Sequence, residues 1–337
     1  MTILHIIHNM EVGGAQTTLY NLVKSLKDEQ HIVLTYKTNE QYATKLSVMT
    51  NVRLIIVFDL KSMFVSLRSL SFDIVHYHWW PQLKVCYHYF HRQNKPIVLT
   101  LQEQCIPPKN DDVYYVAGSH DNFRFIKNMK RKQIIYLGID PTTVVEKTKT
   151  KANNYFNIGR VSTIIPTKIP DNIMDVFKNI SLPNQKIRFA MYGTGEPDYI
   201  DWIRQKAYKY PEIELVIDTD PDVTNKYRNL DAFVYWLPKE STESFGLVII
   251  EAMLSGVPVI AHRAGAIPEI IKHGQNGFLF DDLGEIQSYI QIIAEDEQVR
   301  KQIIYNAKQT VLNRFTHDIM ASNYRKLYYK VISQWRT

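Results

Sequence analysis

Short runs of β-branched and apolar residues alternate with segments of helical periodicity along almost the whole chain. Residues 3–8 read ILHIIH, a Gly-containing turn NMEVGG follows, and AQTTLYNLVKSL then places apolar residues at helical spacing. Further strands are predicted at 31–36, 73–78, 96–101, 113–118 and 133–138. Because helix-length segments separate most of these strands, the pattern predicts a parallel sheet covered by helices on both faces.

A second alternation begins after a polar segment. Residues 140–153 read DPTTVVEKTKTKAN and have no packing period, so we predict a linker there. New strands are predicted at 155–160, 187–193, 213–218, 231–236 and 257–261. The chain of 337 residues also exceeds the roughly 250 to 300 that one core usually holds. We therefore expect two doubly wound α/β domains, 1–145 and 152–316, with the amphipathic helix 317–337 packing back on the first.

The composition is that of a globular protein, with 45% hydrophobic and 22% charged residues. There are two cysteines, Cys86 and Cys105, and the N-terminal residues do not resemble a secretory signal. No run approaches the roughly 18 apolar residues that a membrane span needs. These features predict a cytoplasmic protein whose contact with a membrane, if it makes one, is peripheral.

The positive charge is concentrated in the first half of the chain. Residues 1–150 hold 18 Lys and Arg against 12 Asp and Glu, whereas residues 151–337 hold 22 of each. The run 122–133, NFRFIKNMKRKQ, carries five basic residues and no acid. It is either a solvated face or a contact for an anionic lipid surface or a phosphate-bearing acceptor. Trp79 and Trp80 either add interfacial anchoring or belong to the core or an acceptor site.

The stretch 243–271, ESFGLVIIEAMLSGVPVIAHRAGAIPEII, places two carboxylates eight positions apart. We predict a helix from about Ser244 to just before Gly256, with Glu243 at its entrance and Glu251 two turns inside. Eight helical residues rise about 12 Å. The acids would then be too far apart for the paired carboxylates of a glycosidase, and they would hold different parts of one long ligand.

Between the two acids, the amides of Phe245, Gly246 and Leu247 are predicted to present the positive end of the helix dipole to an anion. A carboxylate, an anion seat and a second carboxylate in series match a hydroxyl group, a diphosphate and another hydroxyl group. A nucleotide sugar has that order. Read without context, the two acids could instead be a helix cap and a surface ion pair.

The same stretch resembles the signature of the retaining family 4 glycosyltransferases, which have the GT-B fold of two Rossmann-like domains facing across a cleft. The segments LHIIHNMEVGGAQTTLYNL, FDIVHYH, YFNIGR, YGTGEP and LDAFVYW resemble successive blocks of that family in order. The resemblance covers nearly the whole chain and is strongest between 226 and 280.

The resemblance implies roles for particular residues. Glu251 would hold the ribose hydroxyls and Glu243 the hydroxyls of the donor sugar, while the amides near Phe245 and Gly246 would meet the distal phosphate. Arg160 and Lys168 are similar to the Arg and Lys that neutralise the diphosphate leaving group. Because such cations stabilise the charge that develops on departure, no metal ion and no cofactor would be required.

The first domain would bind the acceptor. Gly13 and Gly14 resemble the family's glycine-rich loop, and Gln102 stands where the family commonly has a histidine near the transferred sugar. His78 either approaches the acceptor or is a hydrogen-bonded core residue. The chain also departs from the family pattern in two places, with eight positions instead of five between Arg160 and Lys168, and Leu137 in place of an asparagine.

Three motifs are discounted. The pair Gly193 and Gly195 lacks the third glycine of a nicotinamide site and is predicted to form a turn lining the nucleotide pocket. Asp218 and Asp220 have the spacing of a metal-binding Asp-x-Asp, but a solvated loop at a strand end is the better interpretation. His76 and His78 share a strand face, without an acid or cysteine at ligand spacing for a zinc site.

The sequence therefore predicts a metal-independent, retaining hexosyltransferase. It would move a sugar from a UDP- or GDP-linked donor to an acceptor hydroxyl in cell-surface polysaccharide or glycolipid synthesis, at the inner face of the membrane. A saccharide or lipid-linked acceptor is expected, and nucleic acid is not. Two alternatives remain at this point, a catalytically idle sugar-binding homologue and a nucleotide-sugar epimerase of the same architecture.

Overall fold

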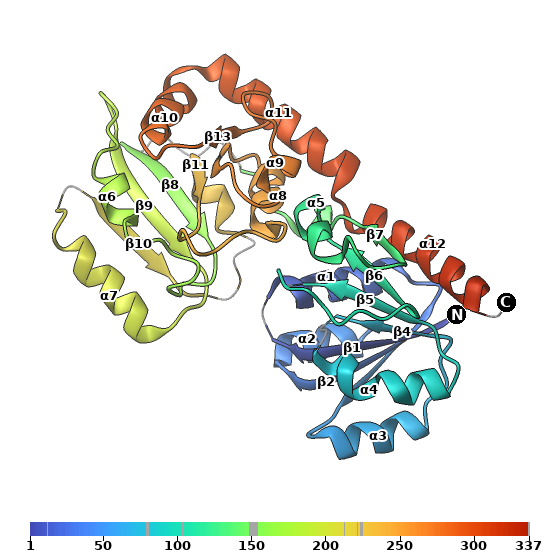
Figure 1. Ribbon diagram of the computed structural model, residues 1–337. Helices are drawn as coiled ribbons and strands as arrows, with labels where there is room; N and C mark the ends of the chain where they lie inside the picture. The colour runs from blue at the N-terminus through green and yellow to red at the C-terminus, as the bar shows by residue number, and fades with distance from the viewer. Residues whose placement is uncertain are drawn as a thin grey trace. The chain divides into compact units, whose positions relative to one another are not determined.

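The protein is described by a computed structural model that covers the chain apart from residues 12, 79–80, 103, 148–153, 212, 221, 223–224 and 336–337, and apart from the side chains of residues 40 and 81–85. Two compact units result. Unit 1 comprises Met1–Ile139 and Phe315–Thr337, and unit 2 comprises Asp140–Arg314. Each unit is built on one parallel sheet (Figure 1).

Unit 1 contains a seven-stranded sheet of order β3-β2-β1-β4-β5-β6-β7. Every residue of β4, β5 and β6 is buried, as expected for central strands of a parallel sheet with both faces covered. The sheet grows outward in both directions from the neighbours β1 and β4. Its strands are β1 (Thr2–Met10), β2 (Gln30–Thr38), β3 (Val52–Ile56), β4 (Ile74–Tyr77), β5 (Ile97–Leu101), β6 (Val113–Ala117) and β7 (Lys132–Ile134).

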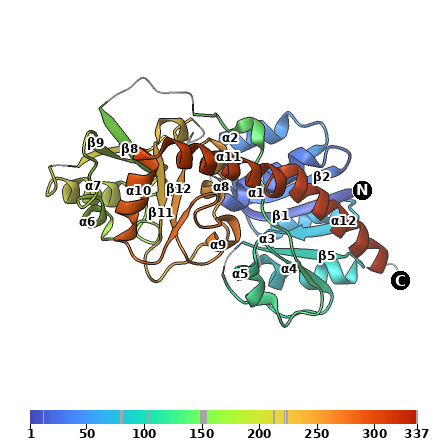
Figure 2. The ribbon, with the colours of Figure 1, turned by 90° about the horizontal axis from the view of Figure 1, so that it is seen from above.

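Helices of unit 1 cover the sheet through apolar clusters on both of its faces. Met63, Phe90 and their neighbours pack on one face, while Leu22 packs with Tyr324 and Tyr328 on the other. The second cluster fixes α12 (His317–Trp335) beside α1 (Gly14–Ser25) (Figure 2). The remaining helices are α2 (Glu40–Ser47), α3 (Leu60–Arg68), α4 (Pro81–Arg92), α5 (His120–Phe123) and the 3₁₀ turn η1 (Arg124–Ile126).

Unit 2 contains a six-stranded sheet of order β10-β9-β8-β11-β12-β13. Its strands are β8 (Tyr155–Val161), β9 (Lys186–Tyr192), β10 (Glu214–Asp218), β11 (Ala232–Tyr235), β12 (Val259–His262) and β13 (Phe278–Phe280). Its helices are η2 (Pro141–Thr143), α6 (Ile173–Phe177), α7 (Pro197–Ala207), η3 (Tyr227–Asn229), α8 (Leu247–Leu254), α9 (Ile267–Ile270), α10 (Glu285–Glu295) and α11 (Glu297–Arg314).

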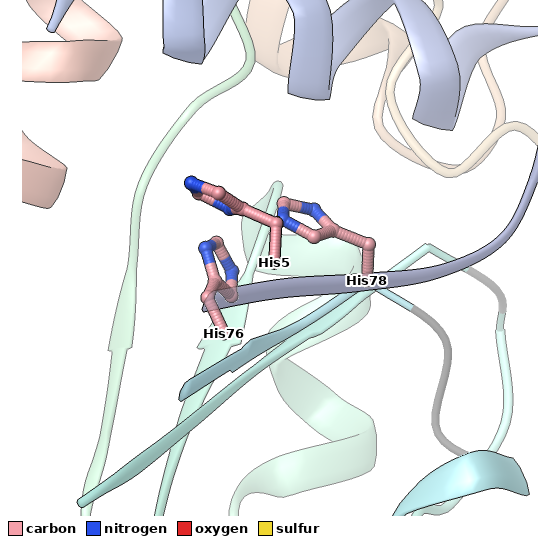
Figure 3. A group of neighbouring side chains, drawn as sticks. All are labelled: His5, His76 and His78. Atoms are coloured by element: carbon pink, nitrogen blue, oxygen red, sulfur yellow. The ribbon is translucent and has the colours of Figure 1, made fainter. Parts of the chain in front are cut away.

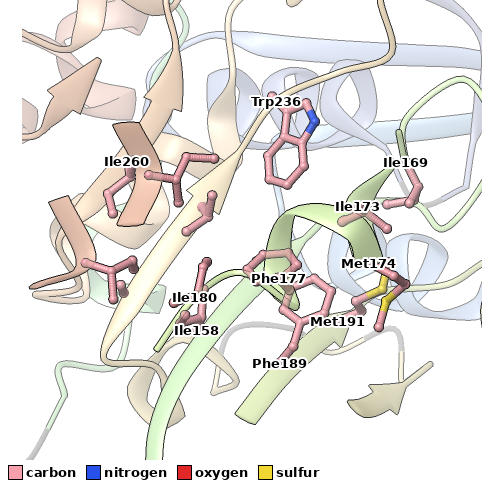
Figure 4. Packing of buried hydrophobic residues seen from close by; sticks show 14 of the residues in the cluster. Ile158, Ile169, Ile173, Met174, Phe177, Ile180, Phe189, Met191, Trp236 and Ile260 are labelled. Carbon is pink, nitrogen blue, oxygen red and sulfur yellow. The ribbon is translucent and has the colours of Figure 1, made fainter. Parts of the chain in front are cut away.

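An aromatic cluster lies at the centre of the core of unit 2. Phe177 stacks on Phe189 with ring centroids 3.8 Å apart, and Trp236 lies 6.0 Å from Phe177. Figure 4 shows the six-membered ring of Trp236 facing this pair and its indole nitrogen on the opposite side. The loop after β11 is therefore anchored by the core through Trp236.

The predicted pair of doubly wound parallel sheets is confirmed, and several details differ. Strands β3 and β13 were not predicted, and β7 ends at Ile134 although a strand was expected to continue to 138. The predicted linker is described only in part, because residues 148–153 lie outside the described residues. The indoles of Trp79 and Trp80 also lie outside them.

The helix that carries Glu251 begins later than predicted. It starts at Leu247, not near Ser244, because Gly246 adopts a left-handed conformation with φ of 99° at the N-cap. Glu243 therefore precedes the helix by four residues, and Glu251 lies about one turn inside it rather than two. The estimate of 12 Å for the separation, which assumed continuous helix, does not apply.

No helix within the described part of the chain is long and apolar enough to cross a membrane.

Candidate active site

Glu243 is held by partners from three segments of unit 2. Its Oε2 accepts a hydrogen bond of 2.5 Å from the Tyr235 hydroxyl at the end of β11, and Lys168 Nζ lies 3.8 Å from the same oxygen. The Ala266 amide donates to the Glu243 carbonyl at 3.0 Å. A Cβ at Gly265, where φ is 55°, would lie 2.5 Å from that carbonyl, so only glycine permits this approach. The Glu243 side chain is 12% exposed, and hydrogen bonds hold both its carboxylate and its backbone carbonyl.

Arg160, near the end of β8, is buried with 1% of its surface exposed. Its guanidinium donates to the carbonyls of Trp236 at 2.6 Å and Lys168 at 2.5 Å, and it lies 4.4 Å from the centre of the Tyr235 ring. Burial lowers the pKa of Arg160, although a guanidinium keeps its proton in proteins. The side chain of Arg160 holds the backbone of Lys168, and its part in neutralising the diphosphate stays a prediction.

Lys168 supplies the accessible positive charge. Its side chain is 38% exposed, in contrast to that of Arg160, and it points toward Glu243. The eight-residue spacing from Arg160 is compatible with this arrangement because the guanidinium binds the carbonyl of Lys168 itself. The longer loop thus still brings the lysine beside the first acid.

Glu251 occupies a different environment on α8. Its Oε2 accepts a hydrogen bond of 2.7 Å from the Tyr227 hydroxyl in η3. Burial raises the pKa of Glu251 to about 7, although the hydrogen bond from Tyr227 acts in the opposite direction. Folding therefore favours the protonated form of this carboxyl group relative to an exposed glutamate.

The first turn of α8 differs from the predicted anion seat. Phe245 precedes the helix, which starts at Leu247. It is 2% exposed, and its amide lies 3.5 Å from Glu243 Oε1. The helix dipole instead ends at the amides of Leu247 and the residues after it. A Cβ added at Gly246 would lie 3.4 Å from Glu243 Cγ, which places the N-cap beside the first carboxylate.

Two glycines form the turn predicted after β9. Gly193 has φ of 134°, and a Cβ there would lie 2.3 Å from the Ser162 carbonyl. A Cβ on Gly195 would lie 2.5 Å from the Ile164 carbonyl. Both glycines therefore allow this turn to pack against the segment after β8. At the end of β10, Asp218 and Asp220 pair with Lys226.

The residues that sequence reasoning missed are the two tyrosines, Tyr227 and Tyr235. Both are buried, and each donates its hydroxyl to one of the acids. For Tyr235 the available signal was its place at the carboxyl end of a predicted apolar strand, because ligand sites of doubly wound sheets lie at these ends. Tyr227 precedes β11 and had no such signal.

The predicted acceptor residues lie in unit 1 at the carboxyl ends of neighbouring strands. Gly13 is the N-cap of α1 and Gly14 its first residue, after β1. His78 follows β4 and Gln102 follows β5. Within the described residues, His78 Nδ1 and Gln102 Nε2 are buried without a hydrogen-bond partner.

A relay of buried imidazoles determines the tautomer of His78. His31 Nε2 lies 2.9 Å from the Leu26 carbonyl, which can only accept, so Nε2 carries the hydrogen. Since burial lowers the pKa of His31, its Nδ1 is a lone-pair acceptor for His5 Nε2 at 3.0 Å. His5 Nδ1 in turn accepts from His78 Nε2 at 3.1 Å. His78 Nδ1 is left unprotonated, and burial lowers the pKa of His78 to about 3.

Three of the histidines converge closely enough to raise the question of a metal. Ring nitrogens of His5, His76 and His78 lie within 4.8 Å of one another (Figure 3). His76 is bonded to the hydroxyls of Tyr328 and Thr100, each at 2.7 Å. Among the described residues no carboxylate joins this group to offset the charge of a metal ion. These hydrogen bonds account for how the three rings are arranged, whereas His78 Nδ1 has no partner among the described residues.

The tautomer of His78 can be measured. In ¹⁵N NMR of the ring nitrogens, we expect Nδ1 of His78 to be unprotonated and Nε2 protonated throughout pH 6 to 8. His31→Gln should preserve this tautomer, because a side-chain amide can accept a hydrogen bond from His5 and donate one to the Leu26 carbonyl. In His31→Leu neither bond can form, so the tautomer of His78 should no longer be fixed. A protonated Nδ1 in the unmodified protein would contradict the relay.

Comparison with known proteins agrees with this fold. The structure of Anabaena HepE in complex with UDP-glucose superposes with a TM-score of 0.81 at 20% identity and covers 98% of this chain and all of that one. The protein therefore has the GT-B fold, with one parallel sheet in each unit.

Residues 144–310 match the family model described as Glycosyl transferases group 1. The chain is 25% identical over 66% of its length to N-acetyl-alpha-D-glucosaminyl L-malate synthase of Bacillus anthracis, of which the match spans 61%. It is 26% identical over 94% of its length to an uncharacterised glycosyltransferase of Methanocaldococcus jannaschii, of which 94% is covered. Residues 144–310 therefore form a Glycosyl transferases group 1 domain in a chain of the GT-B fold.

Proposed function

We propose that this protein is a retaining glycosyltransferase of family 4, which moves a hexose from a UDP- or GDP-linked donor to an acceptor hydroxyl without a metal ion. The observation that carries the proposal is the cluster of Glu243, Lys168 and Arg160 at the start of α8, with Glu251 on the same helix.

The donor would lie along the beginning of α8. Glu251 accepts hydrogen bonds from the two ribose hydroxyls, and Glu243 from hydroxyls of the transferred sugar. The diphosphate meets the first amides of the helix near Gly246 and Leu247, together with the ammonium group of Lys168. The turn that contains Gly193 and Gly195 lines the nucleotide pocket.

Departure of the nucleotide would be assisted by fixed positive charge. The Lys168 ammonium and the helix dipole stabilise the negative charge that develops on the leaving diphosphate. Arg160 acts through the carbonyl of Lys168 and holds that loop in place. The leaving phosphate helps to remove the proton from the acceptor hydroxyl, which attacks from the same face, so the anomeric configuration is retained.

The acceptor is proposed to be a saccharide, free or linked to a lipid diphosphate, in the synthesis of a cell-surface polysaccharide or glycolipid. The excess of basic residues in the first 150 positions supports an anionic partner, such as the inner face of a cytoplasmic membrane. Gly13, Gly14, Gln102 and His78 are the proposed contacts in unit 1.

Thermal unfolding in the presence of UDP-glucose, GDP-mannose and related donors tests the proposal. The correct donor at 100 times its dissociation constant should add about 2.7 kcal/mol of stability. Donor hydrolysis and the anomeric configuration of the product are then followed by NMR. A protein that no nucleotide sugar stabilises, or an inverted product, would refute it, and an isomerised donor without transfer would indicate an epimerase.

A further inference from the structure

A cavity in unit 2 shares two loops with the candidate active site, the loop after β8 that carries Lys168 and the loop after β11 that carries Glu243. Its volume is about 660 Å³, within the range of small-molecule sites. It is formed by the segments that follow β8, β11, β12 and β13. None of the residues that we propose to contact the donor lines it.

The floor of this cavity is aromatic. Trp236 is 4% exposed, and His262 stacks on Phe280 with ring centroids 5.5 Å apart. Trp236 Nε1 is buried and has no hydrogen-bond partner among the described residues. Buried indole N–H groups usually have a partner, and leaving one unpaired costs free energy. Figure 4 shows this nitrogen on the side of the ring away from Phe177. The unpaired donor therefore calls for an acceptor outside the core.

Polar groups surround this floor. Asp171, Asn172 and Lys239 line the cavity and are exposed, as is Asp281. Asp281 is already paired with Arg263 at 3.0 Å. With two carboxylates against one ammonium group, the lining has no cationic cluster and does not suit a phosphate.

We infer that this cavity is a second saccharide site, which binds a neutral sugar unit. An apolar aromatic floor can pack against the C–H face of a pyranose. Trp236 Nε1 can donate a hydrogen bond to a sugar hydroxyl, Asp171 can accept one, and Asn172 can do either. The site goes beyond the proposed donor binding and does not depend on it.

Arg160 connects the saccharide site to the candidate active site through hydrogen bonds to two loops. Arg160 binds the Trp236 carbonyl with one guanidinium nitrogen and the Lys168 carbonyl with the other, at 2.6 and 2.5 Å. The two loops that Arg160 joins are the ones that contribute Trp236 and Asp171 to the cavity. A sugar bound there would therefore restrain the loop that positions Lys168.

Titration of the full chain with methyl glycosides and the corresponding disaccharides of glucose, galactose, mannose and N-acetylglucosamine tests the inference. We expect at least one to bind in the presence of saturating UDP. Trp236→Phe keeps the aromatic ring and removes the N–H, and it should weaken that binding about five- to tenfold. Trp202→Phe, the same change on α7 outside the cavity, should leave it unchanged.

Asn172→Ala provides a second variant that spares the fold, because the Asn172 side chain makes no capping hydrogen bond to α6. It should also weaken sugar binding, without changing the affinity for UDP. The inference is overturned if no glycoside of the panel binds, if UDP displaces the bound sugar, or if both cavity variants bind it as the unmodified protein does. Failure of donor binding with sugar binding intact would instead refute the proposed function alone.

Discussion

Glu251→Gln is expected to weaken donor binding about 30-fold and, at the same time, to stabilise the protein above pH 7. Hydrogen bonds to a charged group contribute about 1.5 to 3 kcal/mol, and the neutral amide would lose roughly 2 kcal/mol of this. Donor affinity of the unmodified protein should also fall about fivefold from pH 7 to pH 6, because the pKa of Glu251 is about 7 and the ionised fraction decreases.

The effect on stability has a definite sign. The pKa of Glu251 is raised from 4.5 to about 7 in the folded protein, so folding favours its protonated form. The contribution of Glu251 to the free energy of unfolding is fully present below pH 4.5 and is lost as the pH rises through 7. The total loss is about 3 kcal/mol. Glutamine does not titrate, and its carbonyl oxygen can still accept the hydrogen bond from the Tyr227 hydroxyl. The stability of the variant should therefore not fall as the pH rises through 7.

Denaturant unfolding from pH 4 to pH 9, with donor titration at each pH, measures both effects. Glu240→Gln, at an exposed position in the same unit, is the matched control and should change neither. If Glu251→Gln and the unmodified protein had parallel stability profiles, the raised pKa would be wrong. If donor affinity were unchanged, the proposed ribose contact would be wrong.

Lys168→Met is expected to lower kcat by about 10²- to 10³-fold, the usual effect of removing a group that stabilises transition-state charge. Stability should change little, because the side chain is 38% exposed and its 3.8 Å pair with Glu243 is partly solvated. The carbonyl of Lys168 that Arg160 binds remains in place, so the loop is retained.

Steady-state kinetics with the donor identified by thermal unfolding measures this effect. Lys168→Arg should keep part of the activity, since it preserves the charge. Lys186→Met, at the exposed amino end of β9, is the control and should be fully active. Unchanged kcat in Lys168→Met would show that this lysine is not the cation of the site.

Local periodicity was sufficient to predict most of the fold. Strands such as β5 and β6 are uniformly apolar because they are buried on both faces, and this pattern can be read without any tertiary information. Strand β3 was missed because it is an edge strand whose residues are only partly buried. Strand β13 has three residues, which is too short to show a period.

The arrangement of the candidate site residues was predicted in part. Glu243, Glu251, Arg160 and Lys168 were all identified from motif and resemblance, and the structure brings three of them together. The late start of α8 was missed because it depends on the left-handed conformation of Gly246, and the helical pattern itself extends to Ser244.

The amino-acid sequence by itself determined the two doubly wound sheets, their order along the chain and the two acids on either side of a helix start. These follow from residue type and spacing within a few turns or strands. Only the tertiary structure decided that the buried Arg160 binds two backbone carbonyls, that the pKa of Glu251 is raised to about 7 and that His78 Nδ1 is buried without a partner among the described residues. Each depends on partners distant in the sequence, such as Trp236, Tyr227 and His5, whose approach is fixed by packing and not by local pattern.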